Sequence, residues 1–238
     1  MSLFVPPRRF DPAVPEVMDR HGNDPALLRA DLRVLEHINR RLGGYHIPLR
    51  YLAELLDKAP TERITILDLA TGAADVPRAV AQWARQRGLH AEITAVDANP
   101  EILQIARERS ASWPEIRFEQ RDLLALPYSP ASFDVVLCSL TLHHFSEPNA
   151  VAVLQRIHDI ARVGYIVNDL RRSCIAIGLS KLMAATIITN PIAKFDAPAS
   201  CERAFRVPEL RAMARKAGLA NAVIRRQRFF RMSIVGRK

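Results

Sequence analysis

Short apolar runs alternate with amphipathic segments from about residue 63 onward, and this alternation predicts the core of the fold. The runs are typical of buried strands and lie at residues 64–70, 91–97, 116–121, 133–139 and 165–169. Helices with one apolar face are expected between them, at residues 76–87, 100–112 and 149–161. Strands that alternate with helices of this length indicate parallel βαβ units. We therefore predict an α/β, Rossmann-like, doubly wound sheet.

The N-terminal part lacks this alternation and is predicted to be helical. Leucines recur on one helical face between Leu28 and Leu42, and the pair Gly43-Gly44 is expected to end that helix. A second helix is expected after Pro48. We therefore assign residues 1–60 to an N-terminal helical cap and residues 61–238 to the main domain.

The chain after the fifth predicted strand also departs from the alternation. A largely apolar helix is expected at residues 173–188, followed by a loop with two prolines and a helix at residues 208–217. Residues 171–207 are thus predicted to be a helical insertion, or lid. The last two segments are predicted to be antiparallel strands that meet at Phe229 and Phe230. The expected fold is a seven-stranded, mostly parallel sheet with helices on both faces.

The composition is that of an ordinary soluble globular protein. The 238 residues fit one embellished domain, with 49% hydrophobic and 25% charged residues. Three scattered cysteines without a CxxC pair argue against disulfides and a cysteine zinc site, and for the reducing cytoplasm. We expect no metal site, and the N-terminus lacks the apolar stretch of a signal peptide. The longest apolar region, residues 174–188, contains Lys181 and is too short to span a membrane.

The net charge of +9 permits a polyanionic partner, but arginines spread along the chain favour a solvated basic surface. One cluster near the C-terminus contains Arg225, Arg226, Arg228 and Arg231. Nucleic-acid contact at this cluster is an alternative that we consider less favoured. No motif in the chain indicates an oligomeric state.

Small residues and acids follow the predicted strands, which is where ligands bind in an open α/β sheet. The first strand ends in ILDLATGAAD at residues 66–75, whose small residues let backbone and ligand approach closely. Asp97 ends the second strand and suits two ribose hydroxyls, and Asp122 follows the third strand and suits an adenine amino group. Three acids around one crevice disfavour a phosphate-bearing ligand. They favour S-adenosylmethionine, which carries a sulfonium and an ammonium and no phosphate.

A nicotinamide cofactor is the neighbouring alternative. It would require G-x-G-x-x-G after the first strand, whereas this turn has Ala70, Gly72 and Ala74, followed by Asp75. The acid argues against a bound pyrophosphate. Each of these residues alone is also compatible with a tight turn or a helix cap. The cofactor site is indicated by their occurrence together, each directly after its own predicted strand.

These segments resemble class I S-adenosylmethionine-dependent methyltransferases, especially the branch of ubiquinone- and menaquinone-biosynthesis-type enzymes. The four motifs of the family are similar here to ILDLATGAAD, AVDANPEIL, QRDLLALPY and FDVVLCSLTLHHF, and the late helix to FRVPELRAMARKAGL. The resemblance covers residues 60–170 closely and residues 204–238 more loosely. Two features depart from the family pattern: Ala70 and Ala74 replace glycines, and ARVGY replaces a proline-glycine-glycine turn.

The resemblance implies cofactor contacts at each strand end. The residues expected to contact S-adenosylmethionine are Asp68, Ala70, Thr71, Gly72, Asp97, Ala98, Asp122, Leu123, Ser139 and Leu140. Of these, Asp68 and Gly72 would face the methionine portion, Asp97 the ribose, and Asp122 with Leu123 the adenine. Ser139 and Leu140 would line the floor of the site beneath the sulfonium.

Methyl transfer to an acidic hydroxyl or carbon requires an acceptor held in line with the methyl group and relieved of a proton. His143 and His144 follow the fourth strand, and we expect them to act as a base or to orient the acceptor. The alternative is that one of them packs on the cofactor or caps the next helix. Arg171 is expected to hold an acidic group of the acceptor, and an exposed charged loop at residues 168–172 is the alternative.

The acceptor is predicted to be small and largely apolar, such as a phenol, a quinone precursor or a polyketide-like aromatic. The insertion helix would roof its pocket, although an apolar helix is also typical of core, and Tyr45 and His46 would close the other side. The expected function is a methyltransferase of the EC 2.1.1 class. An RNA methyltransferase is an alternative, but SLTL at residues 139–142 lacks the Asn/Asp-Pro-Pro-aromatic turn of base amino methylation. A cofactor-binding accessory protein without turnover is the other alternative.

Overall fold

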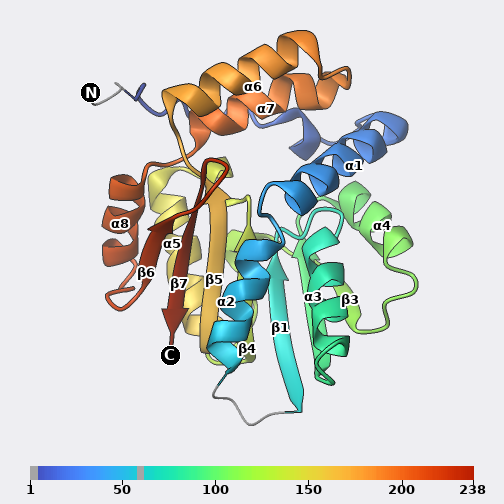
Figure 1. The fold of residues 1–238 in the computed structure, drawn as a ribbon, viewed down its shortest axis with the longest axis vertical. Helices are drawn as coiled ribbons and strands as arrows, with labels where there is room; N and C mark the ends of the chain where they lie inside the picture. The colour runs from blue at the N-terminus through green and yellow to red at the C-terminus, as the bar shows by residue number, and fades with distance from the viewer. Residues whose placement is uncertain (1–4, 58–61) are drawn as a thin grey trace.

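The computed structural model describes residues 5–57 and 62–238 and shows a seven-stranded sheet with helices on both faces (Figure 1). In chain order the elements are η1 (Val17–Asp19), α1 (Pro25–Arg41), α2 (His46–Leu56), β1 (Arg63–Leu69), α3 (Asp75–Arg85), β2 (His90–Asp97), α4 (Pro100–Arg109), β3 (Ile116–Gln120), η2 (Leu123–Ala125), β4 (Phe133–Ser139), η3 (Leu142–His144), α5 (Glu147–Ile160), β5 (Ala161–Leu170), α6 (Cys174–Thr186), α7 (Pro191–Arg203), α8 (Val207–Lys216), β6 (Val223–Arg226) and β7 (Arg231–Arg237). The strand order is β3-β2-β1-β4-β5-β7-β6. The strands β1 to β5 run parallel, and β7 is antiparallel to both of its neighbours. The predicted fold class is confirmed.

Three apolar clusters hold the layers together. On one face, α2 and α3 bury residues such as Leu52 against the sheet. On the other face, α5 and α8 contribute Leu154 and Met213. A third cluster joins α1, α4 and α7 through Leu32 and Ile192. Each fully buried side chain of this size stabilises the fold by about 1.5–3 kcal/mol.

The observed strands follow the apolar runs closely, and only β5 differs by more than a residue at its start. Strand β5 begins at Ala161, immediately after α5 ends at Ile160, so no turn is needed where the family pattern has one. Gly164 lies where β5 approaches β7 and α2, and an added Cβ would lie 2.6 Å from the Gly236 carbonyl oxygen. The ARVGY sequence therefore suits a strand that packs closely on both neighbours.

The predicted loop around Pro191 and Pro198 is wrong, because this segment is the helix α7. The Asn190 side chain accepts hydrogen bonds from the backbone N–H groups of Ile192 and Ala193, and Pro191 occupies the first turn, where a missing N–H costs nothing. Pro198 lies inside the helix. The insertion is therefore a helical hairpin in which α7 packs against α6 across the carboxyl end of the sheet (Figure 1).

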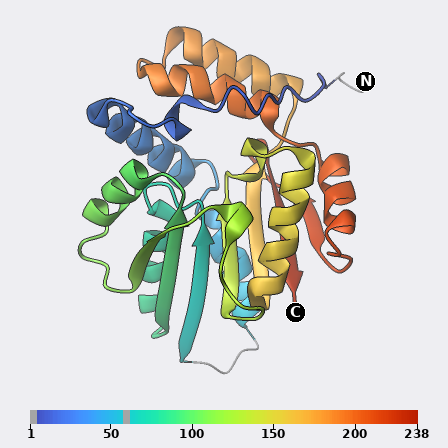
Figure 2. The same ribbon diagram turned by 180° about the vertical axis from the view of Figure 1, so that it is seen from behind.

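The predicted helices of the N-terminal cap begin only at Pro25. Residues 5–24, here called the N-terminal strap, contain only the short helix η1 and are otherwise extended or turn. The strap passes beneath α7 and over the carboxyl ends of the strands to reach α1 (Figure 2). The predicted boundary at residue 60, like residues 1–4 of the predicted cap, lies outside the described residues. Within the described ranges, no helix combines the length and apolarity needed to cross a bilayer.

Candidate functional site

The turn after β1 holds an unusual backbone conformation. Ala70, Gly72 and Ala74 have φ angles of +52°, +54° and +57°, which L-residues rarely adopt. The two alanines therefore keep the backbone shape of a glycine-type turn at a cost of about 1–2 kcal/mol each. An added Cβ at Gly72 would meet no atom within 4 Å, so the backbone here borders open space. Strain of this kind is typical of a ligand site.

Asp97 ties this turn to the end of β2. Its carboxylate accepts hydrogen bonds from the backbone N–H of Gly72 at 2.9 Å and of Asn99 at 3.0 Å. The N–H of Thr71 donates to the Val96 carbonyl at 2.8 Å. Burial raises the pKa of Asp97 to about 6, so the group is mostly ionised at neutral pH. Each carboxylate oxygen can still accept a hydrogen bond from a ligand hydroxyl.

Asp68, near the end of β1, is 2% exposed. Burial raises its pKa to about 7, so a nearby positive charge would favour the ionised form. The neighbouring Thr71 hydroxyl is also buried and has no hydrogen-bond partner among the described residues. An acid and an unpaired hydroxyl beside an open backbone turn fit a ligand that carries both a cation and polar groups.

The other predicted cofactor residues lie at the same edge of the sheet. Asp122 is exposed and accepts a hydrogen bond from the Leu124 N–H at 2.9 Å, while Leu123 is buried. Ala98 is exposed, and Ser139 ends β4. Leu140 has a φ of +55°. The structure thus joins Gly72 to Asp97 by a hydrogen bond and places Asp68 near enough for the Asp97 charge to add to the burial that raises the pKa of Asp68. Asp122 lies at the exposed rim.

A buried polar chain lies beside this turn, on the α2 and α3 face of the sheet. Arg231 donates from Nη2 to Asn39 Oδ1 at 2.9 Å, and Asn39 donates from Nδ2 to Asp75 Oδ2 at 2.9 Å. Arg231 is 2% exposed, and burial lowers its pKa to about 10, so it remains charged at neutral pH. Its Nη1 and both polar side-chain atoms of Asn168 have no hydrogen-bond partner in the described part of the chain.

Sequence reasoning missed this chain, because Arg231 was assigned to the basic C-terminal cluster. The signal that reveals it is strand register. Leu170 pairs with Arg231 and Asn168 with Ser233, so Asn168 and Arg231 point to the same face of the sheet. Because Arg231 is buried, it is not available to an RNA surface.

The predicted acceptor residues differ in their surroundings. Tyr45 is half-buried, and burial together with the nearby Asp75 carboxylate raises the pKa of Tyr45. His46 is exposed at the start of α2. Arg171 is half-buried beside Phe230, with its Nε unpaired among the described residues, and burial lowers its pKa. The alternative of an exposed charged loop at residues 168–172 is wrong, because Arg172 is 2% exposed and pairs with the carboxylate of α8 residue Glu209.

The two predicted catalytic histidines each bind a carboxylate through Nδ1. His143 Nδ1 lies 2.7 Å from Asp169 Oδ1, and His144 Nδ1 lies 2.7 Å from Asp19 Oδ2. Burial disfavours a charged His144, but the Glu16 carboxylate and the bond to Asp19 outweigh it and raise the pKa of His144 to about 9. Burial likewise opposes ionisation of Asp169, yet His143 holds the pKa of Asp169 below its usual range. His144 is therefore charged at neutral pH and poorly suited to accept a proton.

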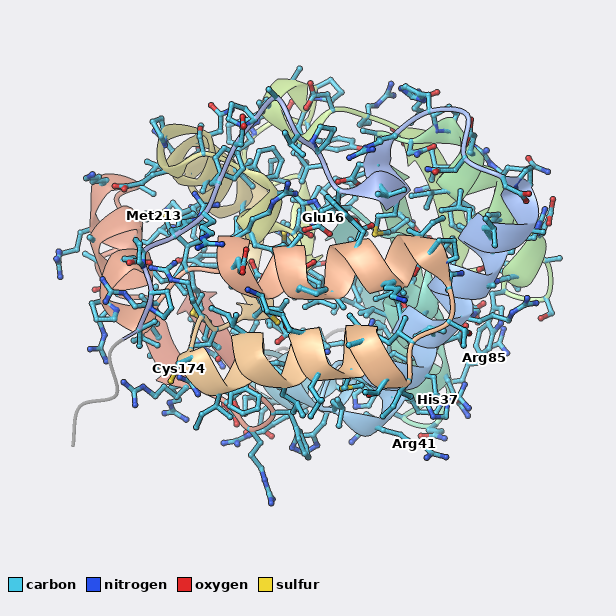
Figure 3. The ribbon with its side chains drawn as sticks, turned by 90° about the horizontal axis from the view of Figure 1, so that it is seen from above. Glu16, His37, Arg41, Arg85, Cys174 and Met213 are labelled. Atoms are coloured by element: carbon cyan, nitrogen blue, oxygen red, sulfur yellow. The ribbon has the colours of Figure 1, made fainter. Side chains whose placement is uncertain are left out.

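Glu16 of the strap faces both histidines. It is 2% exposed and lies next to α7 on the side away from α6 (Figure 3). Ser200 Oγ lies 2.9 Å from each of its carboxylate oxygens, and Arg203 Nη1 lies 3.5 Å from one of them. The sequence contained no signal for this contact, because the strap has no apolar periodicity and its burial depends on α7.

Comparisons with known proteins agree with this geometry. Residues 66–164 match the protein family described as Methyltransferase domain. The chain is 38% identical over 96 residues to a demethylmenaquinone methyltransferase of Deinococcus radiodurans, covering 40% of this chain and 37% of that one. It is 31% identical over 143 residues to a 2-phytyl-1,4-naphtoquinone methyltransferase of Thermosynechococcus vestitus, covering 59% of each. A crystal structure of a SAM dependent methyltransferase from Aquifex aeolicus has a TM-score of 0.56 at 16% identity, covering 96% and 98% of the two chains.

The chain thus covers less than two thirds of the length of either curated relative. The family match at residues 66–164 includes the turn after β1 together with Asp97, Asp122 and both histidines. S-adenosylmethionine is the cofactor that the family match and the similar structure support.

Proposed function

We propose that this protein is a class I S-adenosylmethionine-dependent methyltransferase, similar to those of quinone biosynthesis, and that it methylates a small, largely apolar acceptor. The observation that carries the proposal is the left-handed turn at residues 70–74, held on the Asp97 carboxylate by the Gly72 N–H at 2.9 Å. A turn of this shape leaves backbone and acids facing one open space, which suits a nucleoside with a cationic tail.

The residues fit S-adenosylmethionine, which supplies a methyl group on a sulfonium leaving group when bound. Asp97 would accept the two ribose hydroxyls, and Asp68 would hold the ammonium of the methionine portion. Asp122 and Leu123 would border the adenine. Gly72 allows close backbone approach. These residues bind and orient, and much of the rate of an in-line displacement comes from such positioning.

We place the acceptor oxygen at the buried polar chain. Arg231 Nη1 and the Asn168 amide are unpaired among the described residues, and a buried donor without a partner costs about 1–3 kcal/mol. A phenolate or enolate oxygen would accept hydrogen bonds from Arg231 Nη1 and Asn168 Nδ2, and the guanidinium would neutralise its charge. Tyr45 and His46 at the start of α2, and Arg171 at the end of β5, would border the acceptor. The α6–α7 hairpin would roof it.

His143 and His144 contribute by position in this proposal. His144 is charged at neutral pH and is bound to Asp19 of the N-terminal strap, and His143 is bound to Asp169 of β5. The pair would therefore anchor the strap over the carboxyl ends of the strands. A strap held in place would keep water from the reacting atoms. An RNA substrate is less favoured, because Arg231 is buried and so leaves one member fewer in the exposed basic cluster.

The test is methyl transfer from labelled S-adenosylmethionine to a panel of phenols and hydroxynaphthoquinones. Arg231→Met should raise the acceptor KM at least about tenfold, since it removes a charged hydrogen bond, and leave cofactor affinity within about twofold. Arg228→Met, at an exposed arginine of the same segment, is the matched control and should change neither. Circular dichroism checks that each variant is folded. Cofactor binding without transfer to any acceptor would refute the activity, and an unchanged KM in Arg231→Met would refute the acceptor site.

A further inference from the structure

Three potential metal ligands converge between the strap and the loop after β4. They are Glu16, His143 and His144, whose ligand atoms all lie within 4.8 Å of one another. His143 Nε2 is 3.8 Å from Glu16 Oε1, and His144 Nε2 is 3.9 Å from Glu16 Oε2. These distances are too long for hydrogen bonds. The two rings and the carboxylate therefore face a common point with no direct hydrogen bond between ring and carboxylate.

The opposite nitrogen of each ring is already bound to an acid. Asp169 and Asp19 lie 2.7 Å from the Nδ1 atoms of His143 and His144. A carboxylate at Nδ1 places a proton there and directs Nε2 toward Glu16. Metal-binding histidines almost always have such a partner on the nitrogen that does not bind the metal. Two adjacent histidines that share this arrangement and converge on a third ligand point to a metal rather than to chance packing.

Glu16 also has the surroundings of a ligand. Its oxygens lie 2.9 Å from Ser200 Oγ, and ligating carboxylates are commonly oriented by such hydrogen bonds. Arg203 Nη1 lies 3.5 Å from Glu16, Asp19 and Asp169 are paired with the two histidine rings, and Arg8 donates to the His143 carbonyl. A divalent ion at the common point would take the place of the proton on His144 Nε2, because a metal binds the neutral imidazole.

We propose that Glu16, His143 and His144 bind one divalent first-row transition metal ion, with zinc as the best match to two imidazoles and a carboxylate. Ligand atoms around tetrahedral zinc are separated by about 3.4 Å, given bonds of about 2.1 Å. The observed 3.8 and 3.9 Å thus require each pair to close by about half an ångström. Three protein ligands leave a fourth position for water or a ligand oxygen. The ion would fasten the strap to η3, and this assignment does not depend on methyltransferase activity.

The sequence predicted no metal site, because its three cysteines form no CxxC pair, and the proposed site differs from that prediction. Here the carboxylate belongs to the strap, in the opposite half of the sequence from the histidines, and only packing of the strap under α7 brings it to them.

The test is zinc binding by the full chain after chelator treatment, followed by calorimetry and by metal analysis of the dialysed protein. We expect about one equivalent of zinc and a higher thermal midpoint, because a ligand that binds only the folded state stabilises it. Glu16→Gln and His144→Gln should each weaken zinc binding at least about tenfold, and Asp19→Asn about tenfold through its ring partner. The matched control is His90→Gln, since His90 is an exposed histidine 3.6 Å from Glu92.

Two outcomes would overturn the proposal. One is the absence of zinc binding by the folded wild-type chain, and the other is unchanged affinity in both Glu16→Gln and His144→Gln. Cobalt in place of zinc reports the ligand type, because thiolate ligands give an intense charge-transfer band that nitrogen and oxygen ligands do not. Such a band would assign the metal to cysteines and would also overturn the proposal. His144 has a side chain that is 21% exposed, so its variant is expected to fold even if Glu16→Gln does not.

Discussion

The pH dependence of cofactor affinity tests the assignment of Asp68 directly. Burial raises the pKa of Asp68 to about 7 and that of Asp97 to about 6. Both groups must be ionised to hold an ammonium and to accept from two hydroxyls. Since a carboxyl loses its charge as pH falls through its pKa, affinity for S-adenosylmethionine should fall from pH 7.5 to pH 6. The α-amino group of the ligand loses its proton above about pH 7.7, which sets the upper limit of this window.

The magnitude follows from the two pKa values. A carboxyl with a pKa of about 7 is ionised in about 9% of molecules at pH 6 and about 76% at pH 7.5, an increase of about eightfold. Asp97 adds about twofold over the same range. The ligand's amino group is about 60% charged at pH 7.5, which reduces the product of these factors from about 16-fold to about tenfold. Affinity in the wild-type chain should therefore change about tenfold, or about 1.4 kcal/mol. Asp68→Asn, which keeps the shape and removes the titration, should show only the twofold change from Asp97.

Isothermal titration calorimetry at pH 6, 6.75 and 7.5 measures this difference. As a matched ligand, 5′-methylthioadenosine keeps the adenosine and lacks the ammonium, so it should show only the twofold change in both proteins. A tenfold change that persists in Asp68→Asn would show that another group titrates and would refute the reasoning. So would a wild-type affinity that is flat across the window.

Three further predictions address the backbone turn, a buried acid and the histidines. Gly72→Ala should lower the free energy of unfolding by about 1 kcal/mol, because its φ is +54°, and should weaken cofactor binding by placing a methyl group in the open space; equal calorimetric affinity would contradict this. Asp31, 2% exposed on α1, has a pKa raised to about 7 by burial and by the charges of Asp196 and Glu16. Because the folded pKa of Asp31 is raised from 3.8 to about 7, its neutral form contributes stability below pH 3.8 that is lost as pH rises through 7. The difference between these two pKa values corresponds to about 4 kcal/mol, so Asp31→Asn should be more stable than wild type by up to about 4 kcal/mol at pH 8 and show no gain at pH 4 in urea unfolding. His143→Ala or His144→Ala should lower turnover at least about tenfold while cofactor affinity is largely kept; full activity in both variants would remove these residues from the mechanism.

The sheet was predictable because its strands are buried on both faces and bounded by turn residues. The runs at residues 64–70 and 133–139 coincide with β1 and β4 within one residue. Helix α7 was missed because proline was taken as a breaker, although Asn190 and Pro191 form a helix start. Local sequence rules describe Pro198 as unfavourable in a helix, and packing of α7 against α6 overrides that preference.

The candidate site was predictable only where its residues follow strands. Asp68 and Asp97 were found because their positions along the chain determine their positions at the sheet edge. Arg231 and Glu16 were not found, because their burial depends on an antiparallel strand register and on a segment without periodicity. Ala70 and Ala74 replace glycines of the family pattern, and their left-handed φ angles show that the backbone keeps the shape of a glycine-type turn.

The position of β7 has a consequence for how the protein matures during synthesis. Strands β1 and β2 are consecutive in the sequence and already carry Asp68 and Asp97, so that half of the crevice needs only local pairing. Arg231 belongs to β7, which follows β6 in the sequence and inserts between β5 and β6. A chain in which β7 has not yet paired with β5 would therefore have the β1–β2 side of the crevice while the guanidinium side is still missing.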